Sequence, residues 1–523
     1  MEQAGGGRGR RTSDGAGALR DRRRRGRPGR GPGPGLGGGA AGAQRVLVGA
    51  LGAAGPGVRH PDAHGPQGGA VVTTDRTQAT PTRSLLAGGY RGATIGSFAL
   101  VFLAAFEALA VATVMPTVSR ELDGRAWFAA AFSAALAASL VGMVVVGLWA
   151  DRRGAVRPLL AAVALFGLGL LAAGLAPTMP VLVAGRVLQG LGGGGLTVAL
   201  YVLVAQVYDD VDRPRILGAF AAAWVLPGIV GPLAAGLVAD TVGWRWVFLG
   251  VLVLTGLALA LLVPSLAEVE PPAPSPPVPG GLRRVALAAA VSAGLLTLNA
   301  VAGLPRVVAW PLSVLALGVA LASLRPLLPA GTLRGARGLP AVVALRGAVG
   351  ATFFATEAYL PYLLQEQYDA GLATSGLVLT AATLGWAGAS QVQARLGARL
   401  SDEGALRTGA QGLAAGVVLI LVVAALDLPG ALVVAGWLVA AAGMGLMYPR
   451  ITRAVLARSD ERERGTSSAA VTLADAVGAA AAVALAGLLF TTVGTAVDRE
   501  AFVAVLLLTS VLGAGAVAVS RRV

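Results

Sequence analysis

Runs of apolar residues, each long enough to cross a membrane, follow one another along most of this chain. A membrane-spanning helix needs about 20 mostly apolar residues. Fourteen such runs lie near 92–114, 126–150, 157–176, 179–205, 215–239, 244–264, 285–304, 306–324, 340–362, 371–394, 406–426, 430–449, 466–491 and 500–520. The sequence therefore predicts an all-α polytopic membrane protein with about 14 transmembrane helices.

The composition agrees with this class and excludes several kinds of site. Only 13% of the 523 residues are charged, whereas a soluble domain has about 25%. Disulfides and thiolate metal sites are excluded because the chain has no cysteine. The only histidines are His60 and His64, near the N-terminus, so a histidine-based metal site or catalytic triad within the apolar runs is excluded as well.

The first 84 residues differ from the rest of the chain. They contain 14 arginines and 5 acidic residues, together with many glycines and prolines. Such a composition predicts a disordered tail, and we place it in the cytoplasm. The run Arg22–Arg25 could touch anionic lipid or nucleic acid, but a solvated tail is the simpler interpretation. We expect no nucleic-acid partner.

The remaining chain divides into two halves with an insertion between them. We expect an N-terminal six-helix half at 85–264, a Pro-rich cytoplasmic linker at 265–284, an inserted helix hairpin and loop at 285–339, and a C-terminal six-helix half at 340–523. Each half opens with a run that carries one glutamate followed by a proline: Glu107 and Pro116, then Glu357 and Pro361. Weak internal repetition of this kind is typical of transporter folds.

Arginine bias predicts the orientation of the chain. If the N-terminus is inside, the inside loops carry eighteen arginines and the outside loops carry five. Such an excess marks the cytoplasmic side. We expect a multi-pass plasma-membrane protein with both termini in the cytoplasm.

Five ionisable side chains fall within the apolar runs: Glu107, Arg186, Arg346, Glu357 and Asp475. Each costs about 2.5–3.5 kcal/mol at a helix centre on insertion scales, so such residues are functional candidates. We expect the three carboxyl groups to be functional. Arg346 lies near the start of its run, within reach of the cytoplasmic surface, so we expect it to have a structural role, such as an ion pair between helices, and not a functional one.

A helical arrangement brings some of these residues to common faces. Arg186, Gln189 and Gly190 share one face. Desolvation favours the neutral form of a carboxyl group, so a buried glutamate can carry a proton. An arginine that approaches or withdraws then changes how tightly the proton is held.

Three motifs accompany these residues. The first is the charged loop Gly147-Leu148-Trp149-Ala150-Asp151-Arg152-Arg153-Gly154, between two membrane-length runs. The second is Arg186-Val187-Leu188-Gln189-Gly190-Leu191-Gly192. The third comprises Gly218, Gly231-Pro232 and Gly236 in the fifth run. Small residues there allow close packing and a bend.

In these motifs and in its fourteen-run layout the chain resembles the major facilitator superfamily, and within it the fourteen-span drug:proton antiporters. The resemblance implies a major facilitator fold, with two six-helix halves plus an inserted two-helix hairpin. The roles that it implies are a conformational latch (Gly147, Asp151, Arg152 and Gly154), proton coupling (Arg186, beside Glu107, Glu357 and Asp475) and an antiporter motif (Gly218, Gly231, Pro232 and Gly236). Ala155 and Val156 stand where the latch loop usually continues with a basic pair, and Pro227 and Ala235 replace two glycines of the antiporter motif.

We therefore predict a proton-coupled efflux transporter of small amphipathic compounds that works by alternating access. It would need no metal or other cofactor, draw its energy from the proton gradient, and act as a monomer. Residues expected near the substrate cavity are Gln189, Phe353, Phe354 and Tyr359. An exporter or symporter for one specific metabolite is the alternative on the same fold.

A membrane-embedded enzyme is a further alternative. It would need an Asp-rich metal cluster, for which Asp209-Asp210-Val211-Asp212 is the only candidate. We expect these aspartates instead to cap helices or to pair with Arg213 and Arg215. A nucleotide site is excluded because no Gly-Lys-Ser/Thr follows the glycines at 192–195.

Overall fold

A computed structural model describes residues 90–270, 279–301, 304–460, 464–493 and 498–523. The predicted tail at 1–84, the basic run Arg22–Arg25 and residues 271–278 of the Pro-rich linker lie outside the described residues.

In the described part of the chain every regular element is a helix. The long helices are α1 (Tyr90–Glu121), α2 (Phe128–Arg153), α3 (Val156–Gly174), α4 (Met179–Val207), α5 (Arg213–Val242), α6 (Arg245–Ala267), α7 (Gly281–Ala300), α8 (Arg306–Leu324), α9 (Leu339–Gln367), α10 (Leu372–Leu396), α11 (Asp402–Ala425), α12 (Ala431–Ala457), α13 (Arg464–Val493) and α14 (Arg499–Ser520). Short 3-10 turns lie at Arg125–Trp127, Arg325–Leu327, Thr332–Arg334 and Gly397–Arg399. All fourteen long helices are apolar and long enough to cross a membrane. The predicted all-α polytopic fold is confirmed.

Several helices continue beyond the apolar run that predicted them. The run at 430–449 becomes α12, which ends only at Ala457. The extra turns contain Arg450, whose side chain is buried and hydrogen-bonded rather than exposed in a loop. An apolar run marks the part of a helix that lies within the lipid layer. A helix whose polar side chains have partners inside the protein can extend past that part.

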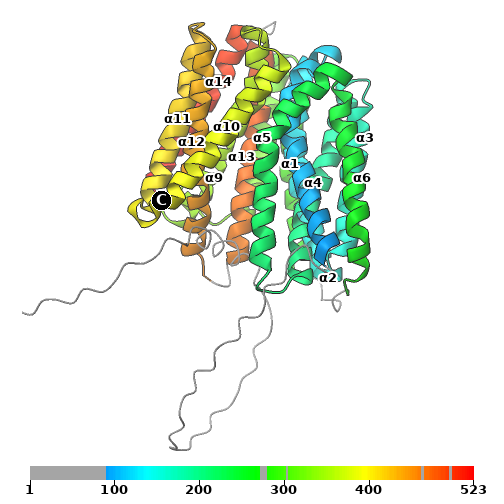
Figure 1. Cartoon of the computed structure of the whole chain (residues 1–523). Helices are drawn as coiled ribbons and strands as arrows, with labels where there is room; N and C mark the ends of the chain where they lie inside the picture. Colours follow the sequence, from blue (N-terminus) through cyan, green and yellow to red (C-terminus); the bar gives the residue numbers. More distant parts are fainter. Residues whose placement is uncertain (1–89, 271–278, 302–303, 461–463, 494–497) are drawn as a thin grey trace, which may run out of the picture. The chain divides into compact units, whose positions relative to one another are not determined.

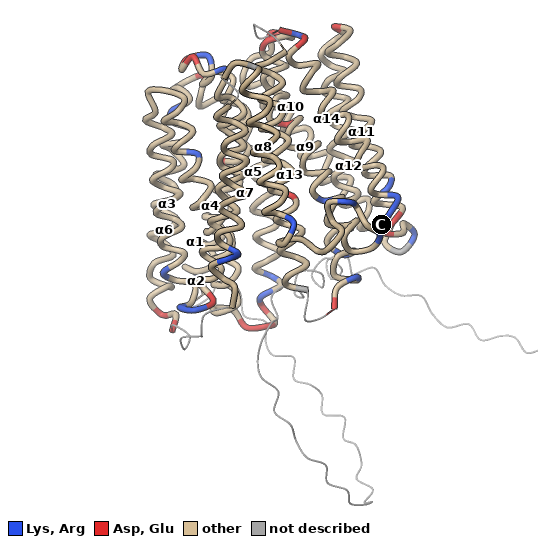
Figure 2. The backbone as a smooth tube through the Cα atoms, turned by 180° about the vertical axis from the view of Figure 1, so that it is seen from behind, with Lys and Arg blue, Asp and Glu red and all other residues tan. Residues whose placement is uncertain are grey.

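Successive helices run in opposite directions, so the loops gather at two ends of the bundle. We call these the Gly124 end, with the α1–α2 loop, and the Gly154 end, with the α2–α3 loop. Figure 2 shows that the charged residues lie mostly near these ends, with few in between. Gly154 has a φ of 78° at the C-terminal cap of α2, a conformation that glycine adopts without steric cost.

The two predicted halves pack in the same internal pattern. In the first, α4 lies between α2 and α3, and α1 lies against α5 and α6. In the second, α12 lies between α10 and α11, and α9 lies against α13 and α14. In Figure 1, α1–α6 run from blue to green on one side, and α9–α14 run from yellow to red on the other.

Helices α2 and α13, and helices α5 and α10, form the main contacts between the halves. We call the two contacts the α2–α13 seam and the α5–α10 seam. The inserted helix α7 packs along α2 and also touches α13, while α8 packs mainly on α7.

Candidate functional site

Glu107, Arg186 and Gln189 form a buried polar network between α1 and α4. Arg186 Nη1 donates to Glu107 Oε1 in an ion pair, and Gln189 Nε2 donates to the same carboxylate oxygen over 3.1 Å. Arg186 Nη1 also lies 3.1 Å from Gln189 Oε1. These residues are only 5%, 4% and 2% exposed. The predicted shared face of Arg186 and Gln189 thus becomes one charge-balanced cluster inside an apolar bundle.

The same arginine reaches a third helix. Arg186 Nε donates to the backbone carbonyl of Ala131 in α2 over 2.8 Å. Small residues let the helices approach this closely, because a Cβ on Gly190 would collide with the carbonyl of Ala135. Glu107 is therefore connected through Arg186 to α2, which carries the Gly147–Gly154 loop at its other end.

A second ion pair lies in the other half, between α9 and α13. Arg346 Nε is 3.1 Å from Asp475 Oδ1, and the two side chains are 11% and 16% exposed. Tyr448 of α12 donates to Asp475 Oδ2 over 2.9 Å, and the Arg346 guanidinium lies 3.4 Å from the centre of its ring. Arg346 was expected to have a structural role. The structure pairs it with Asp475, a residue 129 positions away whose contact spacing along the chain does not reveal.

Glu357 has a different environment from the other two carboxyl groups. It is partly exposed, and among the described residues it has neither a hydrogen bond nor an ion pair. Phe353, one turn earlier on α9, packs against Trp386 and Trp437 with ring centroids 5.3 and 4.5 Å apart. Glu357 is therefore an uncompensated carboxyl group beside an aromatic cluster.

The residues expected to line a substrate cavity are mostly packed against protein in this conformation. Gln189 belongs to the Glu107 network, and Phe353 is 3% exposed. Tyr359 is 2% exposed and contacts Phe128 and Phe490 with ring centroids 5.1 and 5.2 Å apart. Of the four, only Phe354 is partly exposed. Their assignment to the cavity stays a prediction.

The loop predicted to act as a latch lies at the Gly154 end. Asp151 is exposed and Arg152 is partly buried. The buried Nε of Arg152 has no hydrogen-bond partner in the described structure, and no described contact joins Asp151 to the other half. The loop is therefore not engaged across the α2–α13 seam in this conformation.

The residues of the predicted antiporter motif lie along α5, and most of them approach a neighbouring helix closely. A Cβ on Gly236 would lie 3.1 Å from Ala373 of α10, and one on Gly231 would lie 3.3 Å from the ring of Phe106 of α1. The Pro232 carbonyl faces Gly376 of α10 so closely that a Cβ there would collide with it. Gly218 differs, because nothing lies within 4 Å of a Cβ at that position.

The polar contacts between the halves are unevenly placed along the bundle. Among the described residues, the hydrogen bonds and ion pairs that join α1–α6 to α9–α14 lie between mid-bundle and the Gly124 end. Arg120 pairs with Glu366 over 3.1 Å, Arg125 donates to the Phe490 carbonyl over 3.1 Å, and Thr380 donates to the Ile229 carbonyl over 3.1 Å. The halves are thus held together at the Gly124 end.

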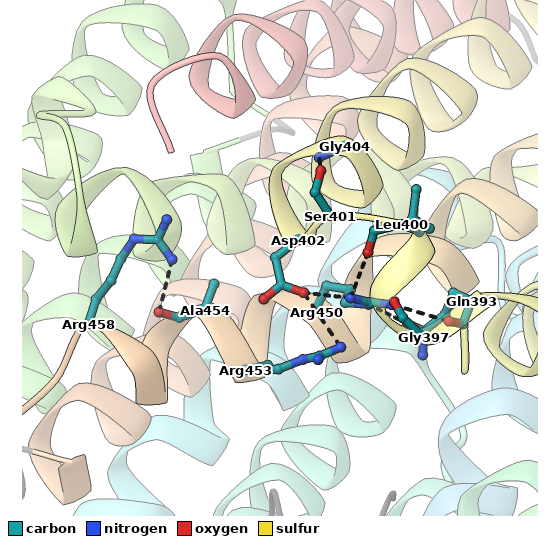
Figure 3. A network of polar contacts seen from close by, with 10 residues as sticks. All are labelled: Gln393, Gly397, Leu400, Ser401, Asp402, Gly404, Arg450, Arg453, Ala454 and Arg458. Atoms are coloured by element: carbon teal, nitrogen blue, oxygen red, sulfur yellow. Dashed lines mark hydrogen bonds and ion pairs between the residues drawn. The ribbon is translucent and has the colours of Figure 1, made fainter. Parts of the chain in front are cut away.

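A buried arginine that the sequence analysis had counted as a loop residue organises the Gly154 end of the second half. Arg450 of α12 donates to the backbone carbonyls of Gln393, Gly397 and Leu400 over 3.0–3.2 Å, and to Asp402 Oδ1 over 2.6 Å (Figure 3). It is 2% exposed. Arg453 reaches the same Asp402 oxygen from 3.5 Å. Arg450 ties the α10–α11 loop, the counterpart of the Gly147–Gly154 loop, to α12.

The acidic run at 209–212 pairs with its neighbours. Arg213 forms an ion pair with Asp210, and Arg215 Nη1 lies 2.9 Å from Asp212 Oδ1. Both pairings confirm what the sequence predicted. No group of three or more histidine, cysteine, aspartate or glutamate residues that could hold a metal ion occurs in the described part of the chain.

A family model for the Major Facilitator Superfamily matches residues 97–483. The chain belongs to the Major Facilitator Superfamily. The matched segment begins in α1 and ends in α13, so it includes nearly all of the first half, the inserted hairpin and most of the second half.

Curated relatives within the Major Facilitator Superfamily align over about a third of the chain. An MFS-type transporter, sphD, of Aspergillus fumigatus is 32% identical over 199 residues, which cover 36% of this chain and 34% of the relative. An uncharacterized MFS-type transporter of Mycobacterium tuberculosis is 36% identical over 179 residues, 33% of this chain and 26% of the relative. An MFS efflux transporter, aclA, of Aspergillus oryzae is 34% identical over 165 residues, 31% and 29% of the two chains. The alignments thus span only about a third of these relatives' own length.

Solved structures of transporters share the fold. A peptide transporter of the POT family, in complex with sulfate, matches with a TM-score of 0.61 at 18% identity, over 83% of this chain and 94% of that chain. The xylose transporter XylE from E. coli, in a partially occluded inward open conformation, matches with a TM-score of 0.55 at 13% identity, over 82% and 96%.

Proposed function

We propose that the chain is a proton-coupled antiporter that exports small amphipathic compounds by alternating access. The observation that carries the proposal is the Glu107–Arg186–Gln189 network. It is a carboxyl–guanidinium pair buried among apolar helices and tied to three of them. Ionisable groups at such depth are costly, and they are found on ion and substrate pathways. The efflux transporters among the relatives support the direction of transport.

A proton on Glu107 would remove the counter-charge of Arg186. An unpaired buried guanidinium is unfavourable, so Arg186 must find other partners or move. Its bond to the Ala131 carbonyl passes that movement to α2. Proton loading at Glu107 would in this way change the packing of α2 against α13, where the two halves meet.

Glu357 is the second group that we assign to the exchange. Because it has no arginine partner among the described residues, its charge must be neutralised by a proton or by a positively charged substrate group. Arg346 and Asp475 already balance each other's charge. We assign to Asp475 a role in which a proton neutralises it and thereby weakens its contact with Arg346.

Arginine bias places the Gly154 end in the cytoplasm, in a plasma-membrane protein whose termini are both cytoplasmic. With that orientation the described polar contacts between the halves lie from mid-bundle to the outer side, which supports an inward-facing conformation. Single cysteines test the orientation directly because the chain has none. A cysteine at Asp123 should react with a membrane-impermeant maleimide in intact cells, and one at Arg337 only after permeabilisation, since both positions are exposed. The opposite pattern would invert the assignment.

Transport in proteoliposomes with an imposed pH gradient tests the function, with a panel of dyes and antibiotics as probes. Glu107→Gln should abolish proton-driven transport, because the amide cannot exchange a proton, while expression stays normal. Glu500→Gln is the matched control, since Glu500 is exposed in the first turn of α14 and should transport normally. Unchanged transport in Glu107→Gln would remove this residue from the mechanism. Absence of substrate-linked proton movement in the unaltered protein would refute antiport.

A further inference from the structure

The inserted hairpin α7–α8 is fixed to one half of the molecule by buried polar contacts. Ser292 Oγ donates to the Ala137 carbonyl over 2.5 Å, and Ser133 Oγ donates to Asn299 Oδ1 over 2.8 Å. The three polar side chains are 4%, 0% and 7% exposed. Both contacts join α7 to α2, which belongs to the first half.

Apolar packing extends this attachment along the whole of α7. At the Gly154 end, a Cβ on Gly281 would meet the Leu148 side chain of α2 at 3.4 Å. Towards the Gly124 end, Leu296 packs on a cluster that includes Ala134 of α2 and Val183 of α4. Helix α7 therefore follows α2 from end to end and reaches α4 as well.

Helix α8 is joined to α7 just as closely. A Cβ on Gly294 would lie 2.7 Å from the Ala316 carbonyl and 3.0 Å from the Ala320 Cβ. Backbones that approach this closely move together, because any separation opens a gap that neither helix can fill.

The contact of α7 with the other half has a different character. Helix α7 touches α13, but its described side-chain hydrogen bonds go to α2 or stay within α7. An apolar contact without hydrogen bonds can slide, since no buried polar group loses its partner when the surfaces shift. Helix α7 also lies beside both helices of the α2–α13 seam, so it covers that seam on one side. No such additional helix packs on α5 and α10 in the described structure.

We propose that the hairpin is a moving part of the first half: α1–α8 rotate as one body against α9–α14, and α7 slides over α13 while it covers the α2–α13 seam. The proposal rests on the alternating-access motion proposed above. The molecule then has two moving bodies, one of eight helices and one of six, and the hairpin does not move independently of the first.

Distances between spin labels test this division without any substrate. Three pairs of cysteines join exposed positions at the Gly154 end: Leu282 with Arg157, Leu282 with Glu403, and Arg157 with Glu403. Between acidic and alkaline pH, the first pair lies within the proposed body and should keep its distance distribution. The other two pairs cross between the bodies and should shift together. If the Leu282–Arg157 distance shifts as much as the others, the hairpin moves independently and the proposal is wrong.

Cross-linking with transport as the readout separates this proposal from the general motion. A disulfide between S133C and N299C should leave at least half of the transport rate, because both residues belong to the same body. A short bismaleimide cross-link between R120C and E366C, whose native side chains pair across the two halves, should lower the rate more than tenfold relative to the same variant without cross-linker.

The failures of the two ideas give different results. Loss of transport in oxidised S133C/N299C, restored by a reductant, would overturn the eight-and-six division and leave the antiport proposal intact. Full transport by completely cross-linked R120C/E366C would overturn the motion between halves, and the division with it. Retained transport in the first pair with loss in the second is the result that we expect.

Discussion

At the scale of single residues, the ionisable groups within the helices separate into paired and unpaired ones. Glu107 is paired with Arg186 and Asp475 with Arg346, whereas Glu357 has no partner among the described residues. A buried pair contributes little to stability as a whole, but the removal of one partner leaves a buried charge that is expensive. When a proton neutralises one member of such a pair, the other is left as an unpaired buried charge, and the free energy of that conformation rises.

Removal of Arg346 should expose this cost. Arg346→Leu leaves Asp475 without its ion pair and should lower the free energy of unfolding by about 3 kcal/mol, the lower end of the range for buried pairs. We place it there because both side chains keep some exposure. A second change, Asp475→Leu, should restore much of the loss, because no isolated charge remains. Thermal unfolding in detergent gives both values.

The control for this prediction is an exposed ion pair of similar geometry. Arg499 lies 2.6 Å from Asp427, and the two side chains are 47% and 51% exposed. Arg499→Leu should cost less than about 1 kcal/mol. Equal losses at Arg346 and Arg499 would mean that the Arg346 site is effectively solvated.

The sequence identified most of these residues but only some of their partners. Arg186 and Gln189 are three residues apart on one helix, so their shared face follows from helical geometry. Arg346 and Asp475 are 129 residues apart, and their meeting depends on how α9 packs against α13. Gly347, Gly350 and Gly478 permit that approach, and nothing in the local pattern indicates it.

At the scale of helices, the apolar runs predicted every long helix because membrane-length runs leave few alternatives. The runs misplaced the end of a helix where a charged side chain in its last turns has hydrogen-bond partners inside the protein. Arg450 directly follows Pro449 and looks like the first residue of a charged loop, yet five oxygens from 48–57 residues earlier surround its guanidinium. A single sequence does not show that convergence.

Arg450 should be essential for the α10–α11 connection. Arg450→Gln leaves the carbonyls of Gly397 and Leu400 unsatisfied, and we expect a loss of about 2–4 kcal/mol in the free energy of unfolding. Arg450→Lys should recover only part of it, because an ammonium group cannot reproduce the planar fork of contacts. Thermal unfolding in detergent, with hydrogen exchange of residues 393–404, gives the size and the place of the effect.

Arg453 is the matched control on the same helix. Its side chain is 46% exposed, and it reaches Asp402 from 3.5 Å. Arg453→Gln should therefore cost less than about 1 kcal/mol and leave exchange at 393–404 unchanged. If the two arginines behave alike, the loop is held by something other than the buried guanidinium.

At the scale of the whole molecule, two corresponding loops at the Gly154 end, the α2–α3 loop and the α10–α11 loop, differ in their contacts. Arg450 fixes the α10–α11 loop within its own half. Asp151 in the α2–α3 loop is exposed, and no described contact joins it to the other half. The sequence identified the loop, and its latch role stays a prediction. The sequence could not predict this state, because one sequence encodes every conformation of the cycle.

Asp151→Asn should therefore act on the conformation that the structure does not show. Here Asp151 makes no described contact with the second half, so its substitution should leave the stability of this conformation unchanged. In the conformation closed at the Gly154 end, the carboxylate is expected to hold the halves together, and its loss should weaken that state. A loss of about 1 kcal/mol would lower the closed population about fivefold, and transport should slow with it.

Spin labels at Arg157 and Glu403 can measure this shift, because one lies in each half at the Gly154 end. In the unaltered background the pair should show a long distance for the open conformation and a shorter one for the closed. Asp151→Asn should deplete the shorter distance, while Asp123→Asn, in a loop at the opposite end, should not. Ala155 and Val156 supply no basic side chains to strengthen the latch, so the closed population should already be small before the substitution. A dominant short distance in the unaltered protein would contradict this weak latch, and unchanged populations and transport rate in Asp151→Asn would remove Asp151 from it.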